Sequence, residues 1–493
     1  MRTAGILLHP VSLPGPDPIG TFGAPARDFV DKLAASGMRW WQMLPLHPTG
    51  LGSSPYMTTS AFAGSALLLD PEDLVALGLV DKRARGSAWN PVEKINYDDA
   101  AGRQGHLMKL AFEAYEAGAN PGLMEEVQAY VASQQWLQPF ALFDAMTRRF
   151  GGAPWWEWPA EFRDHTEGAI ATTRNEHARD IARTHLEQFL FHRQLQQLRS
   201  YASEHGVALF GDMPIFVSHQ SADVWWNREW WRLDGAGQPT HVAGVPPDYF
   251  SPTGQRWGNP LYDFEAMRHT GYSWWIQRIN HLFACFDRVR IDHFRGFQAY
   301  WEIPADAPTA ESGRWVEGPG MDLFAALRRS LGALDIVAED LGTITPEVEG
   351  LRQATGFPGM KVMQFGIGDD LQNPHRPSNV GPASVAYTGT HDNDTTCGWY
   401  QSLDDISRHQ ARLMTQANGL DIAWDMMRLA WHLPSDTAIA PAQDVLRLGS
   451  EARMNTPGIA DGNWAWRMLP RAWTAEHSAQ LRLLTEQSGR LMG

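Results

Sequence analysis

Short runs of apolar residues, each followed by a polar or glycine- and proline-rich loop, recur eight times along the chain. A continuous apolar run of about four to eight residues between turn signals is typical of a strand that is buried on both faces. Stretches with the residue spacing of an amphipathic helix separate most of these runs. The pattern predicts strands at residues 5–9, 40–45, 208–212, 289–293, 335–340, 361–365, 385–391 and 445–449.

The alternation of strand and helix predicts an α/β fold with a parallel sheet. Eight such units in 493 residues favour a closed (β/α)8 TIM barrel over an open doubly wound sheet, and no Gly-x-Gly-x-x-Gly motif follows the first strand. The clearest helix covers residues 184–205, whose leucine and aromatic positions form one stripe, and Gly206 is expected to end it. We therefore expect residues 1–493 to form a single catalytic barrel.

The predicted strands are unevenly spaced, which indicates two insertions. Residues 65–183 span far more than one crossover and carry helical patterns at 104–117 and 122–135, so a mainly helical insertion is expected between strands two and three. Residues 219–262 are rich in Trp, Pro and Gly and are expected to form a loop-rich insertion with a substrate lid. Few residues follow Arg467, so no C-terminal β-sandwich is expected.

Composition and charge narrow the range of partners. Hydrophobic residues make up 43% and charged residues 20% of the chain, as in an ordinary globular enzyme. Lys and Arg total 41 against 56 Asp and Glu, and the resulting net charge of -15 disfavours binding to nucleic acid or to an anionic membrane. A neutral substrate such as a sugar fits this charge. The expected assembly is a monomer or a weak homodimer.

The cysteines and the first ten residues bear on the expected cellular location. Cys285 and Cys397 are too few for the disulfide framework that small secreted domains use. The apolar run at residues 6–8 stops at Pro10 and is too short for a signal peptide or a membrane span. The expected location is therefore the cytoplasm.

Three carboxylates stand where predicted strands end. Asp292, Glu339 and Asp392 each follow a short apolar run. Acidic residues at this point of several parallel strands converge on one pocket in a (β/α)8 barrel. One ionised and one protonated carboxyl group are the parts that cleavage of a glycosidic bond requires. The sequence therefore predicts an enzyme that acts on glycosides.

Two of these carboxylates are candidates for the chemical steps. Asp292 is the candidate nucleophile, because strand alternation places Arg290 on the same face and a guanidinium favours the ionised carboxylate. A purely structural Arg–Asp pair is the alternative. Glu339 is the candidate general acid/base, since apolar surroundings and the charge of Asp292 would raise its pKa.

Other residues are candidates for binding the sugar. Asp392 is expected to hydrogen-bond the ring hydroxyls beside the cleaved bond, and His391 and His293 are expected to donate to the same ring. Most of the 22 tryptophans are expected to fill the core. Indole faces also stack on glucose rings, and Trp257, beside a Pro- and Gly-rich turn, is the best candidate for such a platform.

The sequence contains no motif that points to a metal or a cofactor. It has no His-Glu-x-x-His, no Cys-x-x-Cys and no calcium-binding loop of the EF-hand type. No Gly-x-Ser-x-Gly elbow frames a serine nucleophile. We therefore expect neither a metal nor a cofactor in the site.

At this level of detail the chain resembles the 4-α-glucanotransferases, also called amylomaltases or disproportionating enzymes. Amylase-type hydrolases share only the acidic core of the pattern. The matching stretches run in order through nearly the whole chain: Pro45-Leu46-His47-Pro48-Thr49-Gly50, Ser54-Pro55-Tyr56, Gly211-Asp212-Met213-Pro214-Ile215, Trp257-Gly258-Asn259-Pro260, Arg290-Ile291-Asp292-His293-Phe294-Arg295-Gly296, Ala338-Glu339-Asp340-Leu341-Gly342, Thr390-His391-Asp392-Asn393, Gly449-Ser450-Glu451-Ala452-Arg453-Met454-Asn455 and Gly462-Asn463-Trp464.

The resemblance implies roles for individual residues. Asp292 would be the nucleophile, Glu339 the acid/base and Asp392 the stabiliser of the transition state. Some family members carry an aromatic residue, linked to a secondary glucan site, where this chain has Leu51. Tyr249 and Phe250 resemble the mobile lid of the family. The implied sugar contacts come from Tyr56, Asp212, Gln255, Trp257, Arg290, His391 and Asn463.

The activity that the resemblance implies is a retaining transfer of an α-1,4-glucan segment. A maltodextrin donor would pass the segment to the 4-hydroxyl of an acceptor glucan or glucose through a covalent glucosyl-enzyme. Two alternatives remain at this point: a retaining α-glucan hydrolase with the same three acids, and a glucan-binding protein without catalytic activity. Product analysis distinguishes the three.

Overall fold

The computed structural model describes residues 2–247, 251–459 and 461–491. A closed barrel of eight parallel strands lies at the centre of these residues: β1 (Thr3–Leu7), β2 (Trp40–Gln42), β3 (Ala208–Met213), β6 (Arg288–Ile291), β9 (Ile336–Ala338), β10 (Gly359–Val362), β11 (Ser384–Tyr387) and β12 (Thr437–Pro441). They neighbour one another in the order β1-β12-β11-β10-β9-β6-β3-β2. Nearly all of their residues are buried, as parallel strands covered on both faces require. The predicted TIM barrel is therefore confirmed.

Seven of the eight predicted strands overlap a barrel strand, and the last is wrong. The overlap is small for 361–365, because β10 ends at Val362 and Met363–Gly366 form a 3-10 helix. The eighth barrel strand is β12 and not residues 445–449. Ala438 and Ala440 give β12 a weak strand signal, because alanine has a low strand propensity. Val445 instead ends the short helix α17 (Ala442–Val445), and Arg447 adopts φ 58°, a left-handed conformation foreign to strands.

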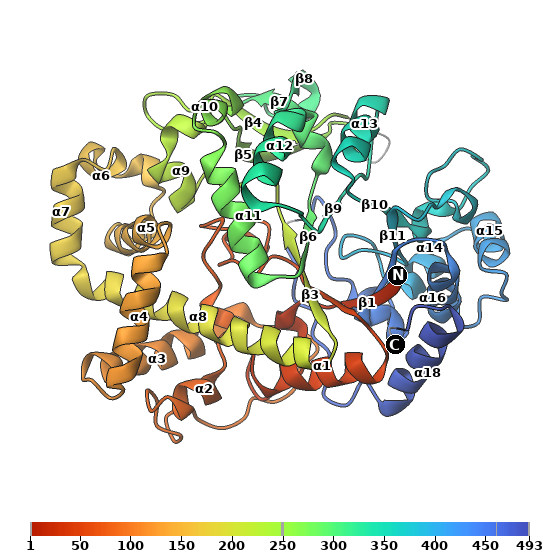
Figure 1. Cartoon of the computed structure of the whole chain (residues 1–493), viewed down its shortest axis with the longest axis horizontal. Helices are drawn as coiled ribbons and strands as arrows, with labels where there is room; N and C mark the ends of the chain where they lie inside the picture. The colour runs from red at the N-terminus through yellow and green to blue at the C-terminus, as the bar shows by residue number, and fades with distance from the viewer. Residues whose placement is uncertain (1, 248–250, 460, 492–493) are drawn as a thin grey trace.

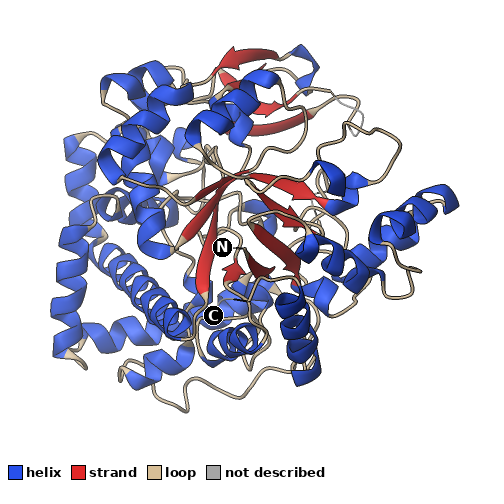
Figure 2. Cartoon of the chain, turned by 45° about the vertical axis from the view of Figure 1, so that its right-hand side comes forward, coloured by secondary structure: helices blue, strands red, loops and turns tan. Residues whose placement is uncertain are grey.

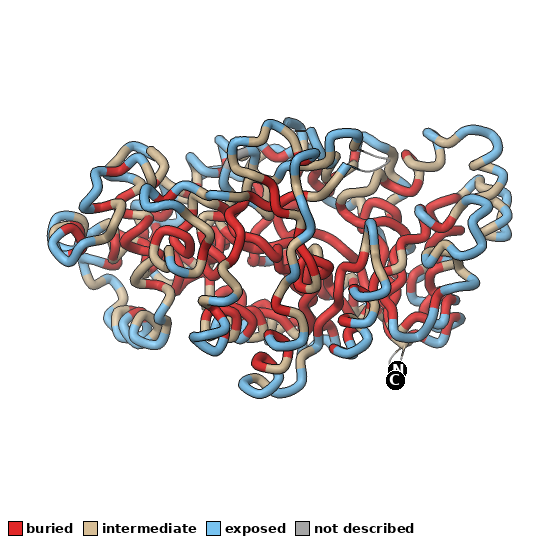
Figure 3. The backbone as a smooth tube through the Cα atoms, turned by 90° about the horizontal axis from the view of Figure 1, so that it is seen from above, coloured by how far each residue is buried: buried red, intermediate tan, exposed pale blue. Residues whose placement is uncertain are grey.

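Helices form a ring around the barrel (Figure 1). They are α1 (Ala24–Ala35), α8 (Ala178–Glu204), α11 (Ser273–Cys285), α12 (Gly320–Leu331), α13 (Pro346–Thr355), α16 (Ile422–His432) and α18 (Ala475–Gln487). Helices α14 (Thr396–Ser402) and α15 (Asp405–Thr415) pack against α16, with α15 farthest from the barrel. Neighbours in the ring touch: α1 contacts α8 and α18, and α12 contacts α11 and α13. Figure 3 shows buried backbone in the interior and exposed segments along the outside. In the described ranges, no helix has the length and apolar character needed to cross a membrane.

The chain between β2 and β3 is mainly helical. It contains α2 (Pro71–Ala76), α3 (Tyr97–Glu116), α4 (Pro121–Ser133), α5 (Leu137–Arg149), α6 (Ala160–Arg163) and α7 (Glu167–Glu176). The side chains of Asn96 and Asn120 cap α3 and α4, so α3 begins well before the predicted residue 104. Helix α8 ends ahead of Gly206, which adopts φ 75° as predicted for a stop.

A second, antiparallel sheet lies beside the barrel (Figure 2). Its strands are β4 (His241–Val245), β5 (Gln255–Pro260), β7 (Ala299–Pro304) and β8 (Arg314–Glu317), in the order β5-β4-β7-β8, with the short helices α9 (Ala222–Trp226) and α10 (Phe264–His269) nearby in sequence. The sequence pattern indicated only loops at residues 219–262. Strand β4 pairs with β5 inside that interval and with β7 outside it, and local sequence pattern does not reveal such pairing.

Candidate active site

The predicted acidic residues lie at or near the ends of barrel strands. Asp292 directly follows β6, Glu339 directly follows β9, and Asp212 lies within β3 near its end. Asp392 belongs to the loop after β11. Because all barrel strands are parallel, these ends lie on one face of the barrel, which is where active sites of this fold are built.

Arg290 is the centre of a buried charge cluster. Its Nη1 donates to both carboxylate oxygens of Asp212 at 2.8 Å, and its Nη2 donates to Oδ1 of Asp292 at 2.7 Å. The predicted contact between Arg290 and Asp292 is therefore confirmed. Burial raises the pKa of Asp212, and the positive charge of Arg290 opposes that rise. The Asp292 side chain is 30% exposed, so it is open to a substrate while Arg290 holds one of its oxygens.

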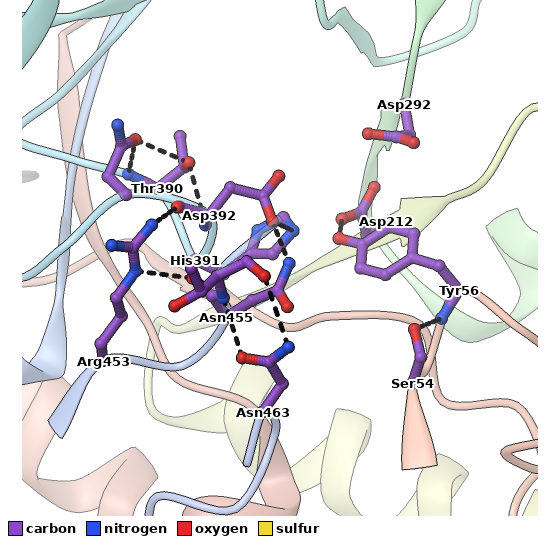
Figure 4. A network of polar contacts seen from close by, with 12 residues as sticks. Ser54, Tyr56, Asp212, Asp292, Thr390, His391, Asp392, Arg453, Asn455 and Asn463 are labelled. Carbon is purple, nitrogen blue, oxygen red and sulfur yellow. Dashed lines mark hydrogen bonds and ion pairs between the residues drawn. The ribbon is translucent and has the colours of Figure 1, made fainter. Parts of the chain in front are cut away.

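Tyr56 connects this cluster to the loop after β11. Its hydroxyl donates to Oδ2 of Asp212 at 2.6 Å. Its ring stacks on His391 with centroids 5.2 Å apart and an angle of 13° between the planes. Figure 4 shows Tyr56 and Asp212 on one side of the site, and His391 and Asp392 on the other.

The Tyr56→Phe substitution is expected to lower the free energy of unfolding by about 2 kcal/mol, because a buried carboxylate loses a hydrogen bond. Urea denaturation measures this change. Tyr201→Phe is the matched control, since its hydroxyl donates to Asp31 at 2.7 Å in an exposed position and its loss should cost less than about 0.5 kcal/mol. Equal losses for the two variants would contradict a structural role for the buried bond.

Glu339 is buried among backbone donors. Its Oε2 accepts the N–H of His293 at 2.6 Å, and its Oε1 accepts the N–H of Leu341 at 2.7 Å. Burial raises the pKa of Glu339 to about 8, and the negative charge of Asp292 adds to the rise. A carboxyl group with this pKa holds its proton at neutral pH, which a general acid must do.

The side chains of His293 and Trp257 lie together beside the acidic residues. Their rings meet edge to face with centroids 4.9 Å apart. Burial lowers the pKa of His293 to about 4, so the ring is neutral, and its buried Nε2 has no hydrogen-bond partner within the described part of the chain. Oε1 of Gln255 accepts from Nε1 of Trp257 at 3.1 Å and fixes the indole on β5. An orphaned polar atom beside a fixed aromatic ring suits a ligand with both hydroxyls and apolar faces.

The Asp392 carboxylate is bound by a residue from the segment between β12 and α18. Nδ2 of Asn455 donates to its Oδ1 at 2.6 Å, and Nε2 of His391 lies 3.4 Å from the same oxygen. Asn463, predicted to touch sugar, uses its amide within its own loop: Oδ1 accepts from the N–H of Thr456 and Nδ2 donates to the carbonyl of Ile459. Asn455 was not singled out from the sequence, although it belongs to a stretch that matches the family.

Two predicted residues fall outside the description of the structure. Tyr249 and Phe250, predicted to form a lid, lie in the interval 248–250 that the described ranges omit. In the ranges that are described, no group of three or more His, Cys, Asp or Glu side chains is arranged to hold a metal ion. Cys285 and Cys397 are both free thiols.

The barrel and its cluster of acids define a class of protein: a (β/α)8 enzyme with carboxylates at the ends of its strands. A family model described as 4-alpha-glucanotransferase matches residues 8–472. The chain belongs to the 4-alpha-glucanotransferase family, whose enzymes transfer glucan segments.

Individual relatives match the chain from end to end. The 4-alpha-glucanotransferase of Thermus thermophilus is 46% identical over 503 aligned residues, which cover 99% of both chains. That of Synechocystis is 43% identical and covers 99% of this chain and 98% of the relative. The structure of an amylomaltase from Streptococcus agalactiae in complex with acarbose superposes with a TM-score of 0.97, at 35% identity and complete coverage of both chains.

Proposed function

We propose that this protein carries out retaining transfer of α-1,4-glucan segments through a covalent glucosyl-enzyme. The observation that carries this proposal is the pairing of two carboxyl groups in different environments. Asp292 is partly exposed and bound by Arg290, whereas Glu339 is buried with a pKa raised to about 8. One group is thereby suited to attack as an anion and the other to donate a proton.

The first half of the reaction forms the covalent bond. Oδ2 of Asp292 attacks the anomeric carbon, because its Oδ1 is held by Arg290. The glycosidic bond breaks as Glu339 gives its proton to the departing oxygen, and the shortened glucan leaves with its new hydroxyl.

In the second half of the reaction, Glu339 removes the proton from the 4-hydroxyl of an acceptor, which attacks the anomeric carbon and releases Asp292. Two inversions leave the α configuration unchanged, which is the outcome when one carboxylate is the nucleophile and the other is the acid/base.

The walls of the site support binding of a glucose ring. Trp257 offers an indole face to the apolar face of the ring, and Nε2 of His293 is available for a hydroxyl. Asp392 has no bond to its Oδ2 among the described residues, so this oxygen is available to the hydroxyls of the flattened ring in the transition state. Transfer is favoured over hydrolysis when the acceptor is bound in line with the anomeric carbon, because a well-placed hydroxyl has a large effective concentration relative to water.

Incubation of the purified protein with maltotriose tests the proposal. Glucose and a ladder of longer maltodextrins are expected, while the total number of reducing ends stays constant. Shorter products with rising reducing ends would identify a hydrolase, and an unchanged substrate that still binds would identify a glucan-binding protein. Proton NMR of fresh products is expected to show only the α anomer at new linkages, and an initial β product would rule out retention.

The cellular setting is a separate part of the proposal. We expect the protein in the cytoplasm, where maltodextrins are used, and as a monomer or weak homodimer. The two free thiols support a reducing compartment. Cell fractionation and light scattering over a range of protein concentrations test the location and the assembly.

A further inference from the structure

The segment at residues 449–455, which we call the anchor segment, has no role in the steps described above. It matches the family pattern, yet none of its residues is one of the three acids. It follows β12 and lies against the loop that carries Asp392. Figure 4 shows Arg453 and Asn455 beside Asp392 and His391, joined by hydrogen bonds.

Several hydrogen bonds join the anchor segment to the loop that carries Asp392, and two of them end on backbone carbonyl oxygens of that loop. Nη2 of Arg453 donates to the carbonyl oxygen of Asp392 at 2.8 Å, and its Nε donates to the carbonyl oxygen of Asn455 at 2.7 Å. The N–H of Asn455 donates to the carbonyl oxygen of His391 at 3.1 Å. Ser450 adds a bond from its Oγ to Oδ2 of Asp394 at 2.6 Å. These bonds fix the path of the loop that carries Asp392.

The anchor segment also holds the Asp392 carboxylate itself. Nδ2 of Asn455 lies 2.6 Å from Oδ1 of Asp392, and a carboxylate only accepts, so the amide nitrogen must be the group that faces it. The Asp392 side chain is 44% exposed, and the terminal torsion of an aspartate has a broad energy well. Without a partner, this carboxylate would rotate in solvent.

We propose that Asn455 is a positioning residue that orients the Asp392 carboxylate toward the sugar ring in the transition state. Its amide occupies Oδ1 and leaves Oδ2 for the ring hydroxyls. A charge-assisted hydrogen bond of this kind is short and directional, so it sets the plane of the carboxylate before the substrate arrives. This inference rests on the proposed role of Asp392 as the stabiliser of the transition state.

The Asn455→Ala variant separates positioning from folding. We expect kcat to fall by about 10–100-fold, because a misplaced group in the transition state costs rate, while KM for maltotriose changes by less than about threefold. Asn418→Ala is the matched control: among the described residues its side chain accepts from the N–H of Leu420 at an exposed position, and its kcat should equal that of the parent. The thermal midpoint of Asn455→Ala is measured to confirm that the variant is folded.

A double-mutant cycle with Asp392→Ala tests whether Asn455 acts through Asp392. In the Asp392→Ala background, assayed at high enzyme concentration, Asn455→Ala is expected to change kcat by less than about twofold. The same loss in both backgrounds would show that Asn455 acts elsewhere and would overturn the inference. Full activity of Asp392→Ala would instead overturn the proposed role of Asp392. Loss in Asp392→Ala with full activity in Asn455→Ala would overturn the inference alone.

The Asn455→Asp variant adds a readout that a merely structural role would not move. The new carboxylate repels Asp392 at neutral pH, whereas its protonated form donates to Oδ1 again. We expect the ratio of its kcat to that of the parent to rise as the pH falls from about 8 to about 5. His391, Arg453 and Tyr56, which also face Asp392 or Asn455, are present in the parent, in Asn455→Ala and in Asn455→Asp, so Asn455→Ala is the reference that lacks only the new carboxylate. A ratio independent of pH, as expected for Asn455→Ala, would contradict the inference.

Discussion

The Asp292→Asn variant is expected to lose kcat by on the order of 10⁴-fold or more, while its dissociation constant for a glucan changes by less than about threefold. The amide has nearly the shape of the carboxylate, and its oxygen still accepts from Arg290. It cannot form the covalent bond to the anomeric carbon. Initial rates with maltotriose and calorimetric binding of a longer maltodextrin measure the two quantities separately.

A matched control lies at the opposite end of the same strand. Asp287 precedes β6, where its Oδ1 accepts from Arg199 at 2.7 Å and its Oδ2 accepts from the N–H of Leu209 at 2.9 Å. Residues at the N-terminal face of a barrel contribute to stability and not to catalysis. Asp287→Asn should therefore lower the thermal midpoint and leave kcat unchanged. An Asp292→Asn variant with parental turnover would refute the nucleophile assignment.

The Glu339→Gln variant is expected to lower kcat with maltotriose by about 10²–10⁴-fold, because an amide cannot protonate the departing oxygen. With an α-glucosyl fluoride donor, the first step should be nearly as fast as in the parent, since fluoride leaves without a proton. A release of fluoride as slow as the turnover of maltotriose would contradict the role of Glu339 as an acid.

The pH profile tests the same residue in the parent protein. Burial and the charge of Asp292 raise the pKa of Glu339 to about 8. The protonated form is the active acid, so kcat should fall as the pH rises through about 8. Glu339→Gln should lack this decline. Asp340→Asn is the control, because Asp340 points away, with Oδ1 accepting from the N–H of Met360 at 2.6 Å, and its variant should keep the alkaline decline.

The positions of the acids could be predicted because their signals are local. An apolar run that ends in a carboxylate marks the end of a buried strand, and strand alternation alone places Arg290 on the same face as Asp292. Helix α8 was predicted from its apolar stripe and from Gly206, which follows its end. Each of these features depends on residues within a few positions of one another.

Features that depend on distant partners were missed or misplaced. Strand β12 consists largely of small residues and is held in the barrel by β1 and β11 on its two sides. Strand β4 is a strand because β7, more than fifty residues later, completes its hydrogen bonds. Neither partner is visible from local pattern, because period and propensity describe a segment and not its neighbours.

The sequence by itself determined the barrel, the three acids and the family, because buried strands, their end residues and the family motifs are all written in short stretches. The tertiary structure decided how those acids are held. In the folded chain Arg290 binds both Asp212 and Asp292, and Glu339 accepts from backbone N–H groups. Asn455 binds Asp392 although 63 positions of the chain separate them. Hydrogen bonds and burial between distant segments set these contacts, and they exist only once the barrel has closed.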